Sequence, residues 1–244
     1  MEKDYKLYVL DNLAAITSDE LEAAIASLPD WRREKALRFK HEQGRKECTY
    51  AYLLLCQALR EIYGIDEQPS FIIGEHGKPE LSFTSPLTSL PSSLSPHTSP
   101  LSPHTLPLSP HTSLLSPHTP NHNCQLSTVN CQLHFTLSHC RQAIACVISE
   151  RPVGVDVESI GRYSESLARH VLSPEEFALV SSAPDPQIPF TRFWTQKEAI
   201  VKLTGRGIDD DLPNLLFKYN NVYLHTEEHL DKGYILSVAT YKNF

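Results

Sequence analysis

The sequence lacks charged residues over one long stretch. From Leu81 to Cys140 there is no Asp, Glu, Lys or Arg, so every charged residue of this 244-residue chain lies outside that block. A solvated surface normally carries charged side chains, and an ordinary core tolerates few prolines. The block therefore fits neither environment. What remains is long enough for two packed halves of roughly 90 residues each.

Other absences exclude whole classes of protein. No apolar run approaches the roughly 18–20 residues of a membrane span. The formal net charge of −7 argues against a general nucleic-acid binder. The six cysteines contain no Cys-x-x-Cys pair and are too few for a disulfide scaffold, so we expect reduced thiols. The first residues show no apolar signal region, and we expect a cytoplasmic protein without membrane or nucleic-acid partners.

The uncharged block is built from repeats. Leu-Ser-Pro-His-Thr occurs four times with a period of seven residues, at 94–98, 101–105, 108–112 and 115–119. Asn-Cys-Gln-Leu occurs twice, at 123–126 and 130–133. A proline in every Leu-Ser-Pro-His-Thr repeat blocks a helix there. The composition therefore predicts a disordered Ser/Pro/His-rich insertion at about 84–133, in a loop between two strands.

The same block contains residue types that bind zinc. They are His122, Cys124, Cys131 and His134. The two cysteines are copies within a duplicated tetrapeptide, and duplication produces regular spacing without any ligand geometry. Duplication is therefore the simpler interpretation, and a zinc site is the alternative.

Outside the insertion, strands and helices alternate twice. Strands are expected at 5–10, 70–73, 134–138, 143–148, 154–158, 215–218, 222–226 and 234–240. Helices are expected from Ser18 to near Leu28, over about 30–63 with an interruption or bend near Gly44, from Ser173, and over 189–204 with a stop at Gly205. The pattern predicts an α+β protein with two similar α/β lobes, residues 1–150 including the insertion and residues 151–244.

The clearest chemical signal lies in the strand Gly154-Val-Asp-Val-Glu158. Alternate side chains of a strand share a face, so Asp156 and Glu158 point the same way, opposite to the neighbouring valines. Two acids on one face repel each other unless a cation or water lies between them. The alternative is a pair of solvated acids on a sheet surface.

A third acid lies in the predicted helix 189–204. Glu198 and Lys202 are one turn apart and share a helix face. An exposed ion pair is the alternative, but Trp194 and Val201 lie beside them. Three carboxylates from strand and helix suit a hard divalent cation, and Mg²⁺ suits them better than Zn²⁺ because neither motif contains His or Cys. Lys202 would reach a phosphate, so the combination indicates phosphate chemistry.

Basic residues add further phosphate contacts. Between Trp31 and Lys46 there are seven basic residues against two acids, a local excess of five positive charges in an acidic chain. Such a run is commonly a solvated helix face. Lys78 lies on the turn Gly-Lys-Pro, and Ser138 and His139 lie at a strand end. Each signal is weak by itself, and their coincidence with a metal site strengthens them.

These motifs, taken in order, resemble a known family. The chain resembles the surfactin-type (Sfp-like) 4′-phosphopantetheinyl transferases over nearly all of its length except about 84–133. The matching motifs are Leu28-Pro29, Arg32-Arg-Glu-Lys35-Ala36 with Arg38-Phe39, Gly77-Lys78-Pro79, Phe135-Thr-Leu-Ser138-His139, Gly154-Val-Asp-Val-Glu158 and Trp194-Thr-Gln-Lys-Glu198-Ala-Ile-Val-Lys202. The last two are specific as a pair.

The resemblance implies an activity and a fold. The activity is Mg²⁺-dependent transfer of 4′-phosphopantetheine from coenzyme A to a serine of an acyl or peptidyl carrier protein, with release of adenosine 3′,5′-bisphosphate. The fold is a pseudo-dimer of two α/β lobes in one chain with coenzyme A between them, and a monomer is expected.

The resemblance also implies roles for individual residues. Asp156, Glu158 and Glu198 would be the metal ligands, Glu198 also the base that takes the serine proton, and Lys202 the group that stabilises the leaving diphosphate. The expected coenzyme A contacts are Arg32, Lys35, Lys78, Ser138 and His139. Family members usually carry Arg-Ser or Arg-Thr where this chain has Glu47-Cys48, so one phosphate contact is missing.

Two rival functions remain open at this stage. The same three acids would serve another Mg²⁺-dependent phosphoryl enzyme, such as a phosphohydrolase. A non-enzymatic carrier-binding scaffold, disabled by its insertion, is the second rival. The sequence does not name the carrier protein.

Overall fold

The computed structural model describes residues 5–74, 77–82, 133–161, 163–207 and 211–242. The strands are β1 (Tyr5–Leu10), β2 (Ser70–Ile73), β3 (Pro79–Ser82), β4 (His134–His139), β5 (Ile144–Ser149), β6 (Val153–Ser159), β7 (Val222–His229) and β8 (Tyr234–Tyr241). The α-helices are α1 (Ser18–Ala26), α2 (Asp30–Leu37), α3 (Glu42–Tyr63), α4 (Glu165–Val171), α5 (Pro174–Ser181), α6 (Gln187–Thr204) and α7 (Leu215–Lys218). The predicted insertion falls outside these residues except for its last position, as do three of the four zinc-type residues.

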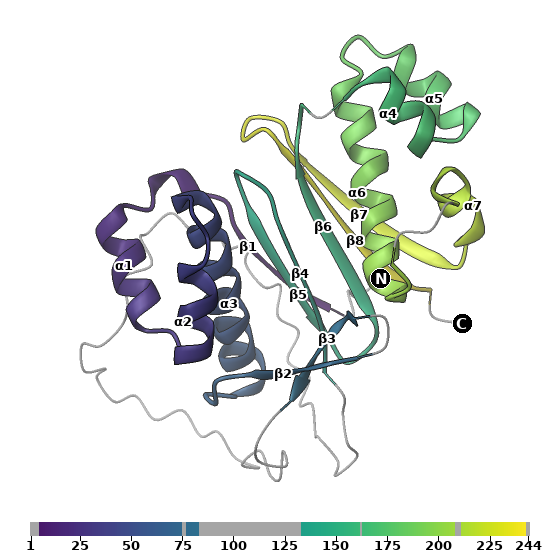
Figure 1. Ribbon diagram of the computed structural model, residues 1–244. Coiled ribbons are helices and arrows are strands. Elements are labelled where there is room, and N and C mark those ends of the chain that lie inside the picture. The colour runs from purple at the N-terminus through teal and green to yellow at the C-terminus, as the bar shows by residue number, and fades with distance from the viewer. Residues whose placement is uncertain (1–4, 75–76, 83–132, 162, 208–210, 243–244) are drawn as a thin grey trace, which may run out of the picture.

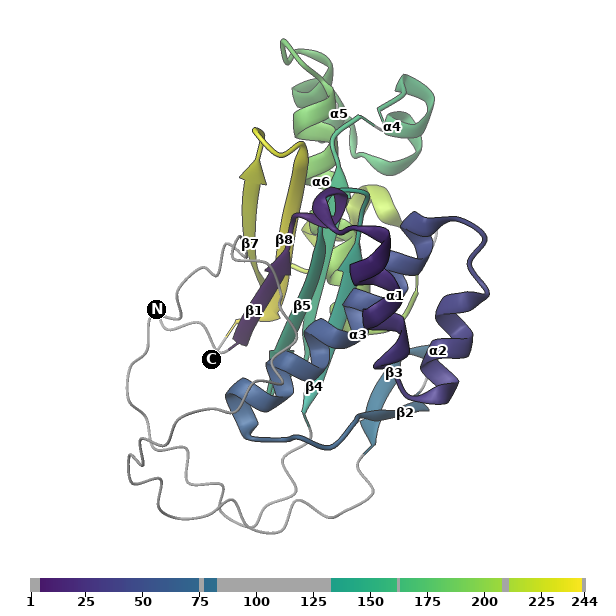
Figure 2. The same ribbon diagram turned by 90° about the vertical axis from the view of Figure 1, so that its left-hand side faces the viewer.

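The described chain is an α+β protein, as predicted, and its elements form layers. Figure 1 shows α1, α2 and α3 on one side, two sheets in the middle, and α6 with α4, α5 and α7 on the other side. The view turned by 90° in Figure 2 shows α3 lying along the face of β4 and β5. The short hairpin of β2 and β3 lies at one end of the first sheet.

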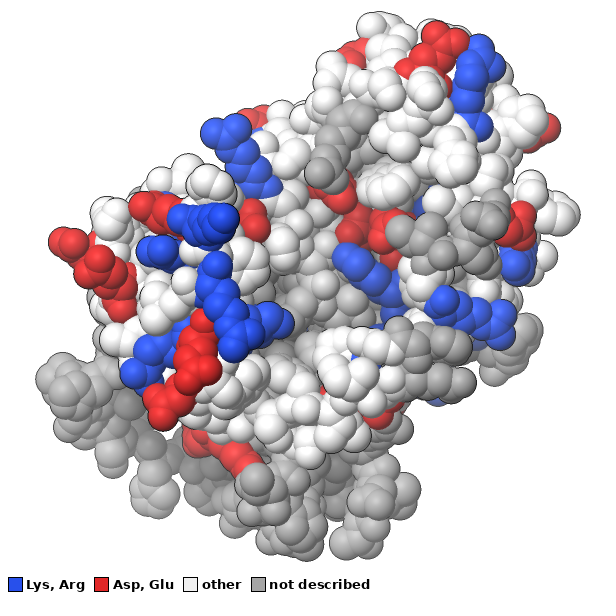
Figure 3. All heavy atoms as spheres, viewed as in Figure 1, with Lys and Arg blue, Asp and Glu red and all other residues white. Residues whose placement is uncertain are grey.

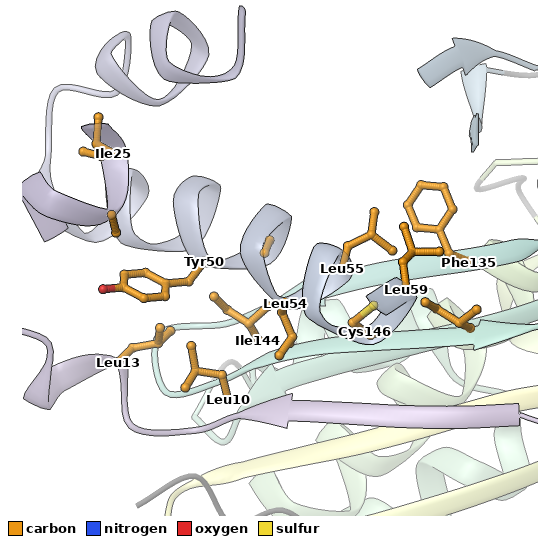
Figure 4. Packing of buried hydrophobic residues seen from close by; sticks show 14 of the residues in the cluster. Leu10, Leu13, Ile25, Tyr50, Leu54, Leu55, Leu59, Phe135, Ile144 and Cys146 are labelled. Carbon is orange, nitrogen blue, oxygen red and sulfur yellow. The ribbon is translucent and has the colours of Figure 1, made fainter. Parts of the chain in front are cut away.

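The first sheet has the strand order β1-β5-β4 and is antiparallel throughout. One of its faces is covered by α3, whose apolar stripe packs onto side chains of all three strands. Figure 4 shows this core, in which Leu54, Leu55 and Leu59 of the helix meet Ile144 and Cys146 of the sheet. Period-3.6 apolar residues on a helix and alternating ones on strands produce this arrangement.

The second sheet repeats the same strand order. Its order is β6-β8-β7, again antiparallel, and α6 covers one face. In each half of the chain, the long helix (α3 or α6) precedes the last two strands. These two strands follow one another in the sequence and pair as a hairpin. The chain passes from the first sheet to the second at residues 150–152, between β5 and β6.

The two sheets pack face to face through apolar side chains. Val153, Val155 and Val157 of β6 are fully buried against residues of β1 and β5, including Ala145 and Val147. The strand alternation predicted from the sequence is therefore present, and it leaves the opposite face of β6 for Asp156. The division into domains at residue 150 stays a prediction, because the sheets share this interface.

One of the predicted elements was wrong. Residues 215–218 form the helical turn α7 rather than a strand, since a short apolar run does not distinguish the two. The predicted interruption of the helical region 30–63 is present at 38–41, just before Gly44, and Gly44 itself lies inside α3. A Cβ at Gly44 would lie 2.7 Å from the Phe39 ring, so this glycine admits that ring instead of bending the helix.

Across the described residues, none of the helices combines the length and apolarity that a membrane crossing requires.

Candidate active site

Gly154 allows α6 to lie unusually close to β6. A Cβ atom at this position would be 2.0 Å from the backbone oxygen of Ala199 and 2.5 Å from the backbone nitrogen of Leu203. Only glycine permits this approach, which resembles other close backbone contacts at glycine in strands. The contact brings the helix turn that carries Glu198 and Lys202 over the face of β6 that carries Asp156.

A hydrogen-bonded network joins the helix to both sheets. The Lys202 ammonium donates to Asp156 Oδ1 at 2.7 Å and to Ser138 Oγ at 2.8 Å. The Ser138 hydroxyl in turn donates to Asp156 Oδ1 at 2.8 Å. Asp156 is 3% exposed, so its charge is compensated inside the protein rather than by solvent. Strand β4 of the first sheet thus contributes directly to a cluster on β6 and α6.

Glu198 lies in the electrostatic field of the other two acids. Burial first, and then the charge of Asp156, raise the pKa of the Glu198 carboxyl above its ordinary value; Lys202 opposes the rise and Glu158 adds to it. The indole Nε1 of Trp194 donates to Glu158 Oε1 at 3.3 Å. The structure therefore brings the three predicted carboxylates and Lys202 into one region, and a raised pKa at such a place is typical of functional sites.

The donor set fits a hard divalent cation. Asp156 Oδ2 and Glu198 Oε1 are buried oxygens without a hydrogen-bond partner among the described residues. Orphaned carboxylate oxygens are costly in a protein interior and are the ligands that Mg²⁺ prefers. In the part of the chain that is described, no three His, Cys, Asp or Glu side chains already surround a common metal position. Lys202 and Trp194 instead hold one oxygen each of Asp156 and Glu158.

Two further predicted residues line the edge of this region. The Lys78 ammonium donates to the backbone oxygen of Lys202 at 2.7 Å, which ties the turn before β3 to the last turn of α6. Burial lowers the pKa of Lys78, and Glu80 partly opposes this. His139 is exposed, and its Nδ1 lies 3.3 Å from Glu47 Oε2 of α3. Glu47 lies at the position where the family usually carries a basic residue. It is therefore the partner of His139, which is one of the predicted coenzyme A contacts.

Arg32 and Lys35 lie apart from the acids, on α2. The Arg32 guanidinium is buried; it donates to the backbone oxygen of Cys48 at 2.9 Å and lies over the Tyr52 ring at 5.3 Å. In this position it joins α2 to α3. Lys35 is exposed. The structure does not place either residue among the contacts of Asp156, Glu158 or Glu198.

The surface between the helical layers is hollowed. Figure 3 shows Lys and Arg side chains, with acidic ones among them, on the side of α2 and α3, and further acidic and basic side chains on the side of β6 and α6. Beside Glu158 there is a pocket of about 270 Å³, mostly apolar, lined by Leu167, Phe190, Thr191 and Trp194 as well as Ser159. A charged rim with an adjoining apolar pocket suits an elongated ligand that is anionic at one end.

Comparison with known proteins finds similarity to one family. The model of the 4′-phosphopantetheinyl transferase superfamily matches residues 152–236, a range that contains all of β6 and α6. The chain is 25% identical over 209 residues to a 4′-phosphopantetheinyl transferase of Bacillus subtilis, covering 84% of this chain and 71% of the relative. These similarities all point to the 4′-phosphopantetheinyl transferase superfamily.

Other phosphopantetheinyl transferases match over shorter ranges. HetI of Nostoc sp. is 42% identical over 81 residues, which are 31% of this chain and 34% of HetI. The psf-1 transferase of Bacillus pumilus is 30% identical over 124 residues, 45% of this chain and 53% of the relative. The superfamily match contains four of the predicted site residues: Asp156, Glu158, Glu198 and Lys202. The other five precede it.

The sequence does not predict the roles of three contributors to the site. Gly154 enters the sequence analysis only as part of a strand motif, Glu47 only as a departure from the family, and Trp194 only as an apolar neighbour and as the first residue of a matching motif. A glycine within a run of valines could have indicated a close backbone approach. The pairing of Glu47 with His139 has no signal in the sequence, because these residues lie 92 positions apart and meet only through the fold.

Proposed function

We propose that this chain transfers the 4′-phosphopantetheinyl group of coenzyme A to a serine hydroxyl of an acyl or peptidyl carrier protein. The observation that carries the proposal is the crossing of α6 over β6, where Lys202 meets Asp156 at 2.7 Å and Glu198 lies within the influence of both other acids. Similarity to the superfamily supports this reaction for the geometry. The carrier and the bound groups are part of the proposal.

The reaction is a phosphoryl transfer with defined bond changes. The serine oxygen of the carrier forms a bond to the phosphorus that bears the pantetheine arm, and the bond from that phosphorus to the bridging diphosphate oxygen breaks. Adenosine 3′,5′-bisphosphate leaves with the bridging oxygen, and the serine proton passes to Glu198, directly or through water. A base with a raised pKa is a better acceptor for that proton at neutral pH.

Asp156, Glu158 and Glu198 would hold Mg²⁺. When bound, the ion would neutralise part of the diphosphate charge and orient it for displacement. Lys202 would follow the charge that develops on the leaving oxygen, as a compact cation on a flexible stem can do. For this, its ammonium must exchange part of its contact with Asp156 for a phosphate oxygen.

The coenzyme A contacts belong to the proposal as well. We assign Lys78 and His139 to the phosphates at the edge of the hollow, and Arg32 and Lys35 to those on the α2 side. The apolar pocket beside Glu158 suits the uncharged arm better than it suits a phosphate. The two lobes would form a pseudo-dimer around coenzyme A, in a monomer that acts in the cytoplasm without nucleic-acid or membrane partners.

Mass measurement of a carrier protein tests the proposal. The purified chain is incubated with coenzyme A, Mg²⁺ and an apo carrier, and the carrier should gain roughly 340 Da, as expected for a phosphopantetheinyl group on a serine nucleophile. A carrier whose serine is replaced by alanine is the control. A phosphohydrolase would consume phosphate ester without changing the carrier mass, and a scaffold would bind the carrier without either change. Either result would refute the transferase.

A further inference from the structure

The hydroxyl of Ser138 is fully engaged within the protein. Its side chain is buried, it donates its hydrogen to Asp156 Oδ1 at 2.8 Å, and it accepts from the Val157 amide at 3.2 Å and from Lys202 Nζ at 2.8 Å. A serine hydroxyl has one hydrogen and two lone pairs. All three are used, so contact with a phosphate oxygen would require one of these bonds to break.

The partners of Ser138 show what the hydroxyl does. Ser138 belongs to β4, whereas Asp156 and Val157 belong to β6 and Lys202 to α6. Asp156 Oδ1 receives two hydrogen bonds, and these fix the rotation of the carboxylate. The other oxygen, Oδ2, is buried and has no hydrogen-bond partner among the described residues. Ser138 therefore determines where this unused oxygen lies.

We infer that Ser138 is a positioning residue, whose hydroxyl orients the Asp156 carboxylate so that Oδ2 is presented to a divalent cation. This differs from the role of direct coenzyme A contact that the family resemblance implies. The inference rests on the proposed function for the identity of the site, but it is tested on metal binding alone. Groups that hydrogen-bond to a metal-ligating carboxylate commonly affect metal affinity by about 10–100-fold.

Thr136 provides a matched control on the same strand. It lies two positions before Ser138, is also buried, and its hydroxyl donates at 2.8 Å to the backbone oxygen of Val153. Both residues thus form a hydrogen bond from β4 to β6. The Thr136 bond ends on a carbonyl, whereas the Ser138 bond ends on the predicted ligand.

The experiment measures two affinities of the full chain. Mn²⁺ binding without coenzyme A is followed by electron paramagnetic resonance, and binding of adenosine 3′,5′-bisphosphate is followed by calorimetry in the presence of EDTA. Ser138→Ala should weaken Mn²⁺ binding about tenfold and leave bisphosphate affinity within about twofold. Thr136→Val should leave both affinities unchanged.

Two results would overturn the inference. One is wild-type Mn²⁺ affinity in Ser138→Ala; the other is a loss of bisphosphate affinity with Mn²⁺ affinity unchanged, which would make Ser138 a direct phosphate ligand. If Ser138→Ala does not fold, Ser138→Cys replaces it, because a thiol is a weak donor of similar size. It should weaken Mn²⁺ binding at least threefold, and wild-type affinity would again overturn the inference. Failure of the carrier assay would refute the transferase function. It would not affect the comparison of Mn²⁺ affinities, which tests the inference by itself.

Discussion

The two halves of the molecule use the same framework for different purposes. The two sheets have the same strand order, and each is covered by one long helix. The stripe of α3 that faces its sheet is apolar and buried, and includes Leu54, Leu55 and Ala58. The corresponding stripe of α6 carries Glu198 and Lys202. A helix packed on a sheet can therefore complete a hydrophobic core or carry functional side chains, depending on which residues occupy a few positions.

The difference has an energetic consequence. Apolar burial over α3 stabilises the fold, whereas the buried Asp156 and the partly buried Glu198 cost desolvation that Lys202 offsets only in part. The sheet-to-sheet interface, with three fully buried valines from β6 alone, supports the strand that carries these acids. The apolar interface between the two sheets thus stabilises the half that carries the chemistry.

The strongest expected effect comes from Glu198→Gln. It should lower carrier modification about a thousandfold, since the amide cannot accept the serine proton. Thermal unfolding in EDTA should show a higher midpoint than wild type at neutral pH. Because the folded-state pKa of Glu198 is raised, its contribution to stability is present below the ordinary carboxyl pKa and is lost as pH rises through the raised value. The gain should therefore vanish in acid; undiminished transfer would remove Glu198 as base.

In the other half, Leu55→Ala should affect stability without affecting chemistry. Leu55 is fully buried in the core under α3. The cavity should lower the free energy of unfolding by about 3 kcal/mol, measured by urea denaturation. The turnover of the folded enzyme should stay within twofold of wild type. A large loss of turnover at full occupancy of the folded state would contradict the division between the halves.

Gly154→Ala should affect both properties. The added Cβ would meet backbone atoms of α6, which must shift away from β6. We expect a loss of stability of about 2 kcal/mol, and a loss of transfer well beyond that of Leu55→Ala, since Lys202 and Glu198 move with the helix. Urea denaturation and the carrier assay on both variants give the comparison. Transfer in Gly154→Ala as high as in Leu55→Ala would show that the close approach is not needed for activity.

The smallest expected effect is an alkaline one and concerns the first half. The described cysteines, Cys48, Cys56, Cys140 and Cys146, all lie in or next to α3 and the first sheet. Burial raises the pKa of the Cys56 thiol from 9.0 to about 11. The unfolded chain ionises first, so this thiol's contribution to stability is present below pH 9 and is lost as pH rises toward 11. Cys56→Ala should reduce the loss of unfolding free energy over this interval, measured by urea denaturation; an unchanged slope would contradict it.

The sequence predicted elements with strong local signals. The strand around Asp156 and the helix that ends at Gly205 follow from period-2 and period-3.6 patterns and a left-handed glycine cap. Patterns of that kind do not identify partners across the fold. Spacing placed Lys202 beside Glu198 on one helix face, whereas its hydrogen bonds extend to Asp156 and Ser138 on two strands.

The missed elements have local causes. Residues 165–171 form α4, although their mixed polar and apolar residues give little periodicity over so short a length. Strand β3 begins at a proline, which removes a backbone donor and is uncommon inside sheets. The interruption between α2 and α3 lies at 38–41, where the Phe39 ring is seated against Gly44 of α3.

Because the two sheets bury a shared apolar surface, neither half of the molecule has a complete core without the other. Cutting the peptide bond within residues 150–152 would yield two fragments, each exposing a valine- or alanine-lined face to water. Kept apart, such fragments should be insoluble; mixed, they should reassociate through that face and regain the Ser138–Asp156 bond, which spans the cut. A split version of the protein would therefore be active only when both pieces are present together.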